Sequence, residues 1–504
     1  MLSIIKSCTL IGVEGFITQI ETDITSGMPA FITVGLPDAS VKEAKDRLSA
    51  ALKNSGFVFP YKRVTINLAP GDIKKEGTHY DLPMALGILF SSGQLVVEAD
   101  FSDTIVFGEL SLNGEIRAVS GTLPIIIEAK RQGYRRVILP YDNGAEASVV
   151  DGIEVIAIKN LCELQQYLYG EKDCVYPSDS PVESTVCYTS DFADVKGQEN
   201  IKRAMEIAAA GGHNMLMIGP PGSGKTMLAR CFPSILPDMT QEESLESTKI
   251  YSIAGLLKPD KPLLKQRPFR APHHTISAVS LTGGGRIPQP GEVSLAHLGV
   301  LFLDELPEFQ KNALEALRQP IEDKLVTISR VNATITYPSS FMLLAGMNPC
   351  PCGHYGDDSN RCRCSEIQIR RYLNRISAPL LDRIDIHTEV PNISYEKLAD
   401  KKAAESSETI RARVNAARQI QLNRYATLPI LMNADLTPRM IETYCRLGEQ
   451  EELLIKQAFT TLNLSGRAYH RILKLARTIA DLDEKRNIEP AHLAEAIQYR
   501  RLER

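Results

Sequence analysis

The apolar positions of residues 1–170 follow two periodicities, which predict a mixture of strands and helices. Short apolar runs bounded by turn residues predict strands at 30–34, 63–67 and 136–139. Apolar positions at helical spacing predict helices at 40–53, 82–90 and 123–132. Asn113-Gly114 separates the runs 106–110 and 115–117 and predicts a β-hairpin, because both residues tolerate the positive φ angles of a two-residue turn. These elements predict an α+β domain.

From residue 191 onward, continuous apolar runs replace the alternating ones. The main runs are 215–218, 300–303 and 341–345. Strands of this kind are typical of a parallel sheet that is buried on both faces. A helical pattern at 201–210 precedes the first run, and short runs at 325–329 and 333–336 predict a hairpin. This part of the chain predicts an α/β fold in which helices flank a parallel sheet.

Residues 405–504 carry helical patterns only. Five apolar residues of one helix form a single stripe: Ala468, Ile472, Leu475, Ile479 and Leu482. Pro490 is placed to open a final helix. Residues 171–190 instead lose their periodicity and gain proline and serine, which predicts a linker. The predicted division is an α+β domain at 1–170, a linker at 171–190, an α/β core at 191–395 and a helical lid at 396–504.

A glycine-rich loop joins the run at 215–218 to the next helical pattern. Glycines permit a tight turn, so that several main-chain N–H groups converge on phosphate oxygens. Lys225 is placed to reach the β- and γ-phosphates, and the Thr226 hydroxyl is placed to bind Mg²⁺. The predicted ATP-binding residues are Gly219, Pro220, Pro221, Gly222, Ser223, Gly224, Lys225 and Thr226. Strand, loop and helix in this order predict an NTPase and not a chance glycine-proline turn.

Two carboxylates and an amide follow the other apolar runs. Asp304 and Glu305 come directly after the run at 300–303, so a parallel sheet would bring them beside the phosphate loop. Asp304 is predicted to hold the Mg²⁺ shell, and Glu305 to orient or deprotonate the attacking water. Asn348 follows the run at 341–345 and can bridge the γ-phosphate and the water, which is the sensor role in AAA+ proteins.

The segment 240–298 is rich in glycine and proline, and such a segment inside a compact domain is usually functional or disordered. It contains the adjacent histidines His273 and His274. Adjacent side chains on an extended segment point to opposite sides, which favours neutral surface or hydrogen-bonding histidines over a metal site.

Four of the ten cysteines cluster in the sequence, as Cys350, Cys352, Cys362 and Cys364. Four thiolates brought together can complete a tetrahedral structural zinc site, with His354 as a reserve ligand. The Cys-x-Cys spacing differs from the Cys-x-x-Cys of common zinc ribbons, so four free reduced thiols stay as the alternative.

Composition adds limits to this picture. Charged residues make up 23% of the 504-residue chain and the formal net charge is -4, so any nucleic-acid contact must come from a local basic surface. No apolar run approaches the roughly 20 residues that span a bilayer, and the N-terminus lacks a signal-peptide pattern. We therefore expect a cytoplasmic protein without a membrane partner.

Residues 106–140, with the sequence GELSLNGEIRAVSG at their centre, resemble the proteolytic domain of the Lon family, which has a ribosomal-protein-like α+β fold. That family uses a Ser and Lys pair. The nucleophile position falls near His79 and the lysine position near Ile125, and neither residue can perform that chemistry. A binding or scaffold role is therefore expected for this domain in place of proteolysis.

The whole chain resembles the ComM/YifB family, magnesium-chelatase-like AAA+ ATPases with a Lon-protease-like N-terminal domain. The resemblance rests on the phosphate loop, Gly283-Gly284-Gly285, the Asp304-Glu305 pair and the sequence NPCPCG that begins at Asn348. It implies a homo-hexameric ring that hydrolyses ATP and binds single-stranded or branched DNA without reading its sequence. The implied activity is helicase or branch migration during the integration of single strands in natural transformation, with recombination proteins as further partners.

The same resemblance assigns roles to basic residues. Arg383 sits where AAA+ rings project a finger into the neighbour's nucleotide, although an ion pair with Asp382 or Asp385 is the alternative. Arg467 sits where a lid arginine touches the γ-phosphate, or it is a solvated helix residue. The implied pore-lining DNA contacts are Arg270, Arg286, Lys324 and Arg330. An ATP-driven remodeller of a protein complex, like the ATPase subunit of magnesium chelatase, is the competing function.

Overall fold

The structure is a computed structural model that describes residues 2–96, 100–177, 188–258, 260–285, 288–330, 333–356, 361–392, 404–462 and 464–500. The chain divides into two compact units. The first contains Met1–Ser184 and Ser244–Leu264, and the second contains Thr185–Glu243 and Lys265–Arg504. Part of the glycine- and proline-rich segment therefore belongs to the first unit.

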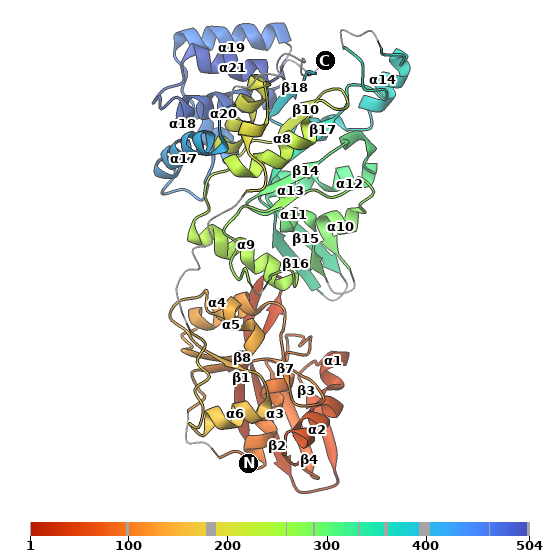
Figure 1. The fold of residues 1–504 in the computed structure, drawn as a ribbon, viewed down its shortest axis with the longest axis vertical. Coiled ribbons are helices and arrows are strands. Elements are labelled where there is room, and N and C mark those ends of the chain that lie inside the picture. Colours follow the sequence, from red (N-terminus) through yellow and green to blue (C-terminus); the bar gives the residue numbers. More distant parts are fainter. Residues whose placement is uncertain are drawn as a thin grey trace. The chain divides into compact units, whose positions relative to one another are not determined.

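The first unit is built on a seven-stranded sheet in the order β3-β4-β2-β1-β5-β8-β9. The strands are β1 (Ser3–Ile11), β2 (Glu14–Thr25), β3 (Ala30–Val34), β4 (Arg63–Ala69), β5 (Thr104–Val106), β8 (Arg136–Pro140) and β9 (Glu154–Ile158). β2 pairs antiparallel with both β1 and β4, whereas β5, β8 and β9 continue the sheet in parallel (Figure 1). The long β1–β2 hairpin was not predicted from the apolar pattern.

Helices complete the first unit and give it an α+β fold. They are α1 (Ala39–Lys42), α2 (Ala44–Asn54), α3 (Asp81–Ser91), α4 (Thr122–Arg131), α5 (Gly144–Ala147) and α6 (Leu161–Leu168), with a 3-10 turn at η1 (Tyr141–Asn143). Nearly every side chain of α3 is buried, as expected for a helix that is apolar on all sides. The helix predicted at 40–53 is wrong in one respect, since it breaks at Glu43 into α1 and α2.

The turn predicted at Asn113-Gly114 is confirmed, but its strands are shorter than expected. They are β6 (Glu109–Leu110) and β7 (Ile116–Arg117), and they pair antiparallel. Val106 instead ends β5 in the main sheet. Helix α9 (Gln241–Ile253) contributes its later residues to this unit, where Ser252 Oγ donates a hydrogen bond to the Glu146 carboxylate.

The second unit contains a five-stranded parallel sheet in the order β11-β14-β17-β10-β18. The strands are β10 (Met215–Ile218), β11 (Phe269–Arg270), β14 (Val300–Leu303), β17 (Met342–Met347) and β18 (Ile386–Glu389). Nearly all side chains of β10, β14 and β17 are buried, which explains their continuous apolar sequences. Because the strands are parallel, the residues that follow β10, β14 and β17 meet at one edge.

Helices and hairpins surround this sheet. The helices are α7 (Glu199–Gly211), α8 (Lys225–Cys231), α10 (Ala278–Thr282), α11 (Glu292–Leu295), α12 (Lys311–Ala316), α13 (Arg318–Asp323), α14 (Glu366–Leu373) and α15 (Ala378–Leu381). The 3-10 turns are η2 (Phe192–Asp194), η3 (Phe232–Ile235) and η4 (Leu306–Glu308). One hairpin joins β12 (Gly283–Gly284) to β13 (Gln289–Pro290), and the predicted hairpin joins β15 (Leu325–Arg330) to β16 (Ala333–Pro338).

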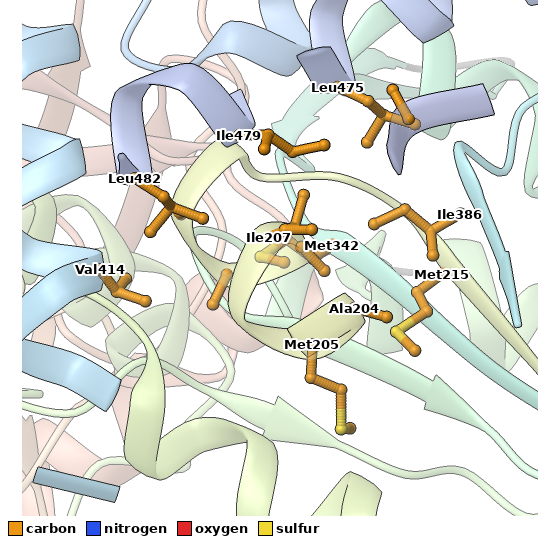
Figure 2. Packing of buried hydrophobic residues seen from close by; sticks show 14 of the residues in the cluster. Ala204, Met205, Ile207, Met215, Met342, Ile386, Val414, Leu475, Ile479 and Leu482 are labelled. Atoms are coloured by element: carbon orange, nitrogen blue, oxygen red, sulfur yellow. The ribbon is translucent and has the colours of Figure 1, made fainter. Parts of the chain in front are cut away.

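The carboxyl-terminal part of the second unit is helical, as predicted. Its elements are α17 (Ser407–Arg424), η5 (Asn433–Asp435), α18 (Pro438–Tyr444), α19 (Glu449–Leu462), α20 (Gly466–Leu482) and α21 (Pro490–Gln498), drawn in blue in Figure 1. The predicted stripe of α20 is buried. Figure 2 shows Leu475, Ile479 and Leu482 of α20 in one cluster with Ile207 of α7 and Met215 of β10. The structure confirms an α/β fold with a helical C-terminal part, and none of its described helices is long and apolar enough to cross a membrane.

Candidate nucleotide site and cysteine cluster

The phosphate loop connects β10 to α8. Gly222 and Gly224 adopt φ angles of +78° and +89°, which favour glycine. Among the described residues, no heavy atom lies within 4 Å of the point where a Cβ would stand on either glycine. The loop therefore has the conformation and the open space that close approach of a phosphate group requires.

The Lys225 side chain folds back on the phosphate loop and bonds to its main chain. Its ammonium donates hydrogen bonds to the carbonyls of Gly219 (2.7 Å) and Pro220 (2.9 Å) and to Asn348 Oδ1 (3.2 Å). Burial lowers the pKa of Lys225, and the nearby carboxylates of Asp304 and Glu305 oppose that shift. The structure thus brings the predicted lysine and the predicted sensor asparagine together.

The two predicted magnesium ligands also meet. The Thr226 hydroxyl donates to Asp304 Oδ2 over 2.6 Å, although β17 lies between β10 and β14, the strands that precede these two residues. Asp304 Oδ1 accepts the main-chain N–H of Glu305 over 3.0 Å. A carboxylate and a hydroxyl at this distance offer the hard oxygen ligands that Mg²⁺ prefers, so the residues fit that ion.

Glu305 has a neighbour that sequence reasoning missed. His274 Nδ1 lies 3.4 Å from Glu305 Oε2, and Glu305 itself has a left-handed backbone with φ of 52°. The rings of His273 and His274 lie 4.1 Å apart, so the expectation that they point to opposite sides is wrong. Neither histidine belongs to a cluster of possible metal ligands among the described residues. Only the turn after β11 brings His274 to Glu305, and no sequence spacing signals it.

A cavity of about 360 Å³ opens beside Thr226. Its lining residues are Ser190, Asp194, Thr226, Met227, Arg230 and Cys231. Gln198, at the start of α7, ties this region to the phosphate loop, since its side-chain amide donates to the carbonyls of Ser223 (2.8 Å) and Pro391 (3.3 Å). A nucleotide whose phosphates occupy the loop would find space here for its base and ribose.

Arg383 lies at the other end of the sheet from its own phosphate loop. It precedes β18, whose first residue Ile386 pairs with Met215, the first residue of β10, whereas the loop follows the last residue of β10. The Arg383 guanidinium is 12% exposed, donates to the Pro379 carbonyl over 2.7 Å and forms an ion pair with Glu322. The expected alternative partners, Asp382 and Asp385, are not the partners in this structure.

Arg467 lies near the same glutamate. The pKa of Glu322 is lowered first by its hydrogen bond to Arg383 and further by the charges of Arg467 and Arg471. Arg471 in turn pairs with Asp385 (3.5 Å), whose pKa is held low by His213 and Arg471 against the opposing effect of burial. Two arginines with predicted nucleotide roles, Arg383 and Arg467, thus gather around Glu322.

The predicted DNA-contacting residues have mixed surroundings. Arg270 forms a two-pronged ion pair with Glu292, with distances of 2.6 and 2.8 Å, so its charge is balanced within the chain. Lys324 lies 3.7 Å from the carboxylate of Asp435. Arg286 and the side chain of Arg330 lie outside the described residues. Of the four residues, the two whose side chains the structure describes, Arg270 and Lys324, each lie beside a carboxylate of the same chain.

The four clustered cysteines meet in space. Their sulfurs all lie within 4.8 Å of one another: Cys362 Sγ is 3.8 Å from Cys350 Sγ and 3.7 Å from Cys352 Sγ, and Cys350 Sγ is 3.3 Å from Cys352 Sγ. In a tetrahedral site with Zn–S bonds of about 2.3 Å, neighbouring sulfurs are about 3.8 Å apart. The main-chain N–H of His354 and the Cys350 thiol lower the pKa of Cys352 to about 6. The donor set and its spacing fit a tetrahedral thiolate-bound ion.

Comparison with known proteins decides the family. The chain is 44% identical to Competence protein ComM of Haemophilus influenzae over 100% of this chain and 98% of that protein. It is also 44% identical to the uncharacterized protein YifB of Escherichia coli, with the same coverage. The chain belongs to the ComM/YifB family.

Family models for magnesium chelatase match most of this ComM/YifB chain. The one described as Magnesium chelatase, subunit ChlI, covers residues 191–398, and the one for the ChlI C-terminal region covers 404–500. A third, described as Subunit ChlI of Mg-chelatase, covers 20–143. The second unit is therefore a magnesium-chelatase-like AAA+ domain that carries a helical C-terminal region.

A short stretch of the chain is similar to a protease. Lon protease 2 of Bacillus subtilis is 36% identical over 96 residues, which are 19% of this chain and 17% of that protein. At the positions that the resemblance assigns to the Lon catalytic pair, His79 is buried with its pKa lowered by burial to about 4, and Ile125 is 1% exposed. Neither side chain supplies a nucleophile or an accessible base.

Proposed function

We propose that this protein is a magnesium-dependent ATPase that works as a homo-hexameric DNA motor. The observation that carries the ATPase part is the convergence of Lys225, Thr226, Asp304, Glu305 and Asn348 at one edge of a parallel sheet. These side chains follow the ends of three strands that are far apart in the sequence, β10, β14 and β17, and they lie around one open glycine loop. Family membership adds the prior expectation of an AAA+ ATPase.

Each residue has a role that follows from its chemistry. The loop N–H groups and the Lys225 ammonium bind the phosphates, while Thr226 and Asp304 hold Mg²⁺. An ion held by these two residues would supply neutralisation of charge on the phosphate oxygens. Glu305 orients the attacking water and accepts its proton, and Asn348 aligns that water with the γ-phosphate.

The ring is supported by the place of Arg383. A guanidinium at the amino end of the sheet is remote from its own nucleotide loop, so its natural target is the nucleotide of a neighbouring subunit. Arg467 is close enough to Glu322 to share that edge, and we assign it to the same intersubunit site. Repeating one such head-to-tail contact generates a closed ring when the rotation that relates neighbouring subunits closes on itself.

The DNA substrate is proposed mainly on kinship. The relative from Haemophilus influenzae is named a competence protein, which supports a role in the integration of incoming single strands and contact with recombination proteins in the cytoplasm. The β15–β16 hairpin and the β12–β13 hairpin are the segments proposed to meet the phosphate backbone. Lys324 would need to leave Asp435 to do so.

A branch-migration assay tests this function. Purified protein with ATP should convert forked or four-way DNA to separated products at low salt, where phosphate contacts are strongest, and Glu305→Gln protein should not. Protein that hydrolyses ATP but neither binds nor responds to such DNA at low salt would exclude the DNA motor.

The second candidate function is an ATP-driven remodeller of a protein complex. It is favoured by the magnesium chelatase family models, which match both the AAA+ core and the helical region. Affinity capture of a stable protein partner whose presence stimulates ATP hydrolysis, together with no response to DNA, would select this function over the first.

The four cysteines are proposed to hold one zinc ion. Thiolate ligands suit Zn²⁺, and the sulfur spacing matches a tetrahedral site. Metal analysis of the purified protein should find one zinc per chain, and Cys352→Ser should lower that content.

A further inference from the structure

The cysteine cluster is packed against the phosphate loop. Gly353 follows Cys352, and a Cβ added to Gly353 would lie 2.4 Å from Cδ and 2.6 Å from Cγ of Pro221. Real carbon atoms do not approach so closely, and a proline ring cannot rotate away because it is part of the main chain. The cysteine-bearing turn thus touches the loop at a position where only glycine fits.

A second link runs through the sensor residue. Cys350 stands two residues after Asn348, whose side chain accepts a hydrogen bond from Lys225. The main chain of Asn348 opposes the rise that burial causes in the pKa of the Tyr372 hydroxyl, so the two groups are neighbours. Tyr372 belongs to α14, which begins after the cap residue Ser365, directly after Cys364. Both halves of the cluster are therefore connected to the nucleotide site, one through Asn348 and Gly353 and the other through Tyr372.

We infer that the metal ion bound by Cys350, Cys352, Cys362 and Cys364 braces the phosphate loop, so that nucleotide affinity depends on the occupancy of a site that does not touch nucleotide. This inference rests on the proposed zinc and ATP sites. The ion links the turn after β17 to the start of α14. The turn is thereby fixed, which keeps Gly353 packed against Pro221 of the phosphate loop. Loss of the ion separates the two halves and leaves the loop free to move from its binding conformation.

Metal removal gives the first test. Zinc content is measured by elemental analysis, and the affinity for a fluorescent ATP analogue is measured on the same full-length protein before chelation, after chelation and after Zn²⁺ is restored. The chelator is removed and Mg²⁺ is kept in excess in each binding measurement, so that the Mg²⁺ expected at Thr226 and Asp304 is the same throughout. We expect the dissociation constant to rise at least tenfold on chelation and to recover with zinc. Cys162→Ser is the control for the Cys352→Ser variant proposed above, since Cys162 is exposed and remote in sequence from the cluster.

Alanine substitutions at two glycines, Gly353 and Gly356, distinguish the effect of the contact with Pro221 from the effect of backbone strain. Gly353 and Gly356 have φ angles of +82° and +80°, so alanine is equally strained at both. Only the Gly353 Cβ would meet Pro221, because nothing in the described structure lies within 4 Å of the Gly356 Cβ position. Gly353→Ala should raise the dissociation constant for the ATP analogue about tenfold, equivalent to about 1.4 kcal/mol, with zinc retained. Gly356→Ala should change it less than about twofold, below 0.5 kcal/mol.

The outcomes are distinguishable. Chelation without a change in affinity, or equal effects of the two glycine variants, would overturn the brace. Absence of zinc before and after Zn²⁺ addition would overturn the metal site, and this result comes from elemental analysis alone. Zinc-loaded protein that fails to bind the ATP analogue would instead overturn the proposed ATPase. Gly353→Ala retains all four thiols, so it tests the contact even if the cysteine variants fail to fold.

Discussion

Replacing Lys225 by methionine should separate nucleotide binding from the stability of the free protein. In the structure, the three nearest acceptors of the Lys225 ammonium are the Gly219 and Pro220 carbonyls and Asn348 Oδ1, and Ser223 Oγ is a more distant fourth at 3.5 Å. Losing three such hydrogen bonds lowers the free energy of unfolding by about 1 kcal/mol for each bond. Removing the ammonium charge raises it by several kcal/mol, because that charge is buried and no carboxylate among the described residues is hydrogen-bonded to it. The two effects oppose each other, so the unliganded variant should unfold at nearly the wild-type temperature.

Unlike stability, the affinity for ATP should only decrease in Lys225→Met. Nucleotide binding exchanges neutral acceptors of Lys225 for charged phosphate oxygens, and two such exchanges are worth about 2–3 kcal/mol, a 30- to 150-fold change in affinity. At an ATP concentration of about 100 times the wild-type dissociation constant, ligand stabilises the wild type by about 2.7 kcal/mol. With affinity reduced about 100-fold, the same ATP concentration stabilises Lys225→Met by only about 0.4 kcal/mol.

Thermal unfolding with and without magnesium-ATP measures both quantities. For a unit of about 300 residues, 1 kcal/mol shifts the unfolding temperature by about 1.6 °C, so ATP should raise that of the wild type by about 4 °C and that of Lys225→Met by less than about 1 °C. The control is Lys474→Met, a buried lysine of α20 that donates to the Ala434 carbonyl and whose pKa is also lowered by burial. An equal ATP shift in wild type and Lys225→Met would refute the proposed contact with the phosphates.

Three further variants test other parts of the account. Glu305→Gln should keep ATP binding and lower turnover by about 10²–10⁴-fold, because the carboxylate acts on water. Its control, Glu308→Gln at an exposed glutamate, should keep turnover. Parallel loss of binding and turnover in Glu305→Gln would contradict the proposed role of Glu305. Asp481→Ala removes the partner of the buried Arg477 and the partly buried Arg424, and it should lower the free energy of unfolding in urea by about 3–5 kcal/mol. The half-exposed Asp483→Ala should lower it by about 1 kcal/mol or less. Burial lowers the pKa of His387 to about 3, so the folded state resists a proton that the unfolded state accepts near pH 6.5, and stability is lost as the pH falls toward 3. His387→Gln should therefore remove up to about 1.4 kcal/mol per pH unit from the acid dependence of unfolding, and unchanged dependence would show that His387 is not buried neutral.

The parts of the site that follow strand ends could be predicted from the sequence. Asp304, Glu305 and Asn348 each come directly after a continuous apolar run, and parallel pairing of β14, β17 and β10 fixes where such residues must meet. The contacts Thr226–Asp304 and Lys225–Asn348 follow from that topology. The cysteine cluster was likewise foreseeable as a group of four, because two closely spaced pairs flank a short loop.

Contacts made by turns and loops could not be predicted. His274 lies beside Glu305 because of the path that the chain takes after β11. Arg383 pairs with Glu322, which lies 61 residues earlier, and not with Asp382 or Asp385. Local spacing carries no information about either partner. The β1–β2 hairpin was missed for another reason: polar residues such as Ser7 and Thr18 are fully buried in it, so its apolar alternation is weak. The packing of Gly353 on Pro221 also depends on a tertiary approach that a glycine alone does not reveal.

ATP hydrolysis by a mixture of two inactive variants tests most directly whether neighbouring subunits share each active site. Glu305→Gln protein lacks the water-orienting carboxylate but keeps Arg383, and Arg383→Ala protein has the complementary defect. In a randomly mixed ring at equal ratio, about a quarter of the interfaces join an intact Glu305 to an intact Arg383 of the next subunit. The account predicts that the mixture hydrolyses ATP at about a quarter of the wild-type rate, far above either variant alone. A mixture no more active than the sum of its two components would contradict it.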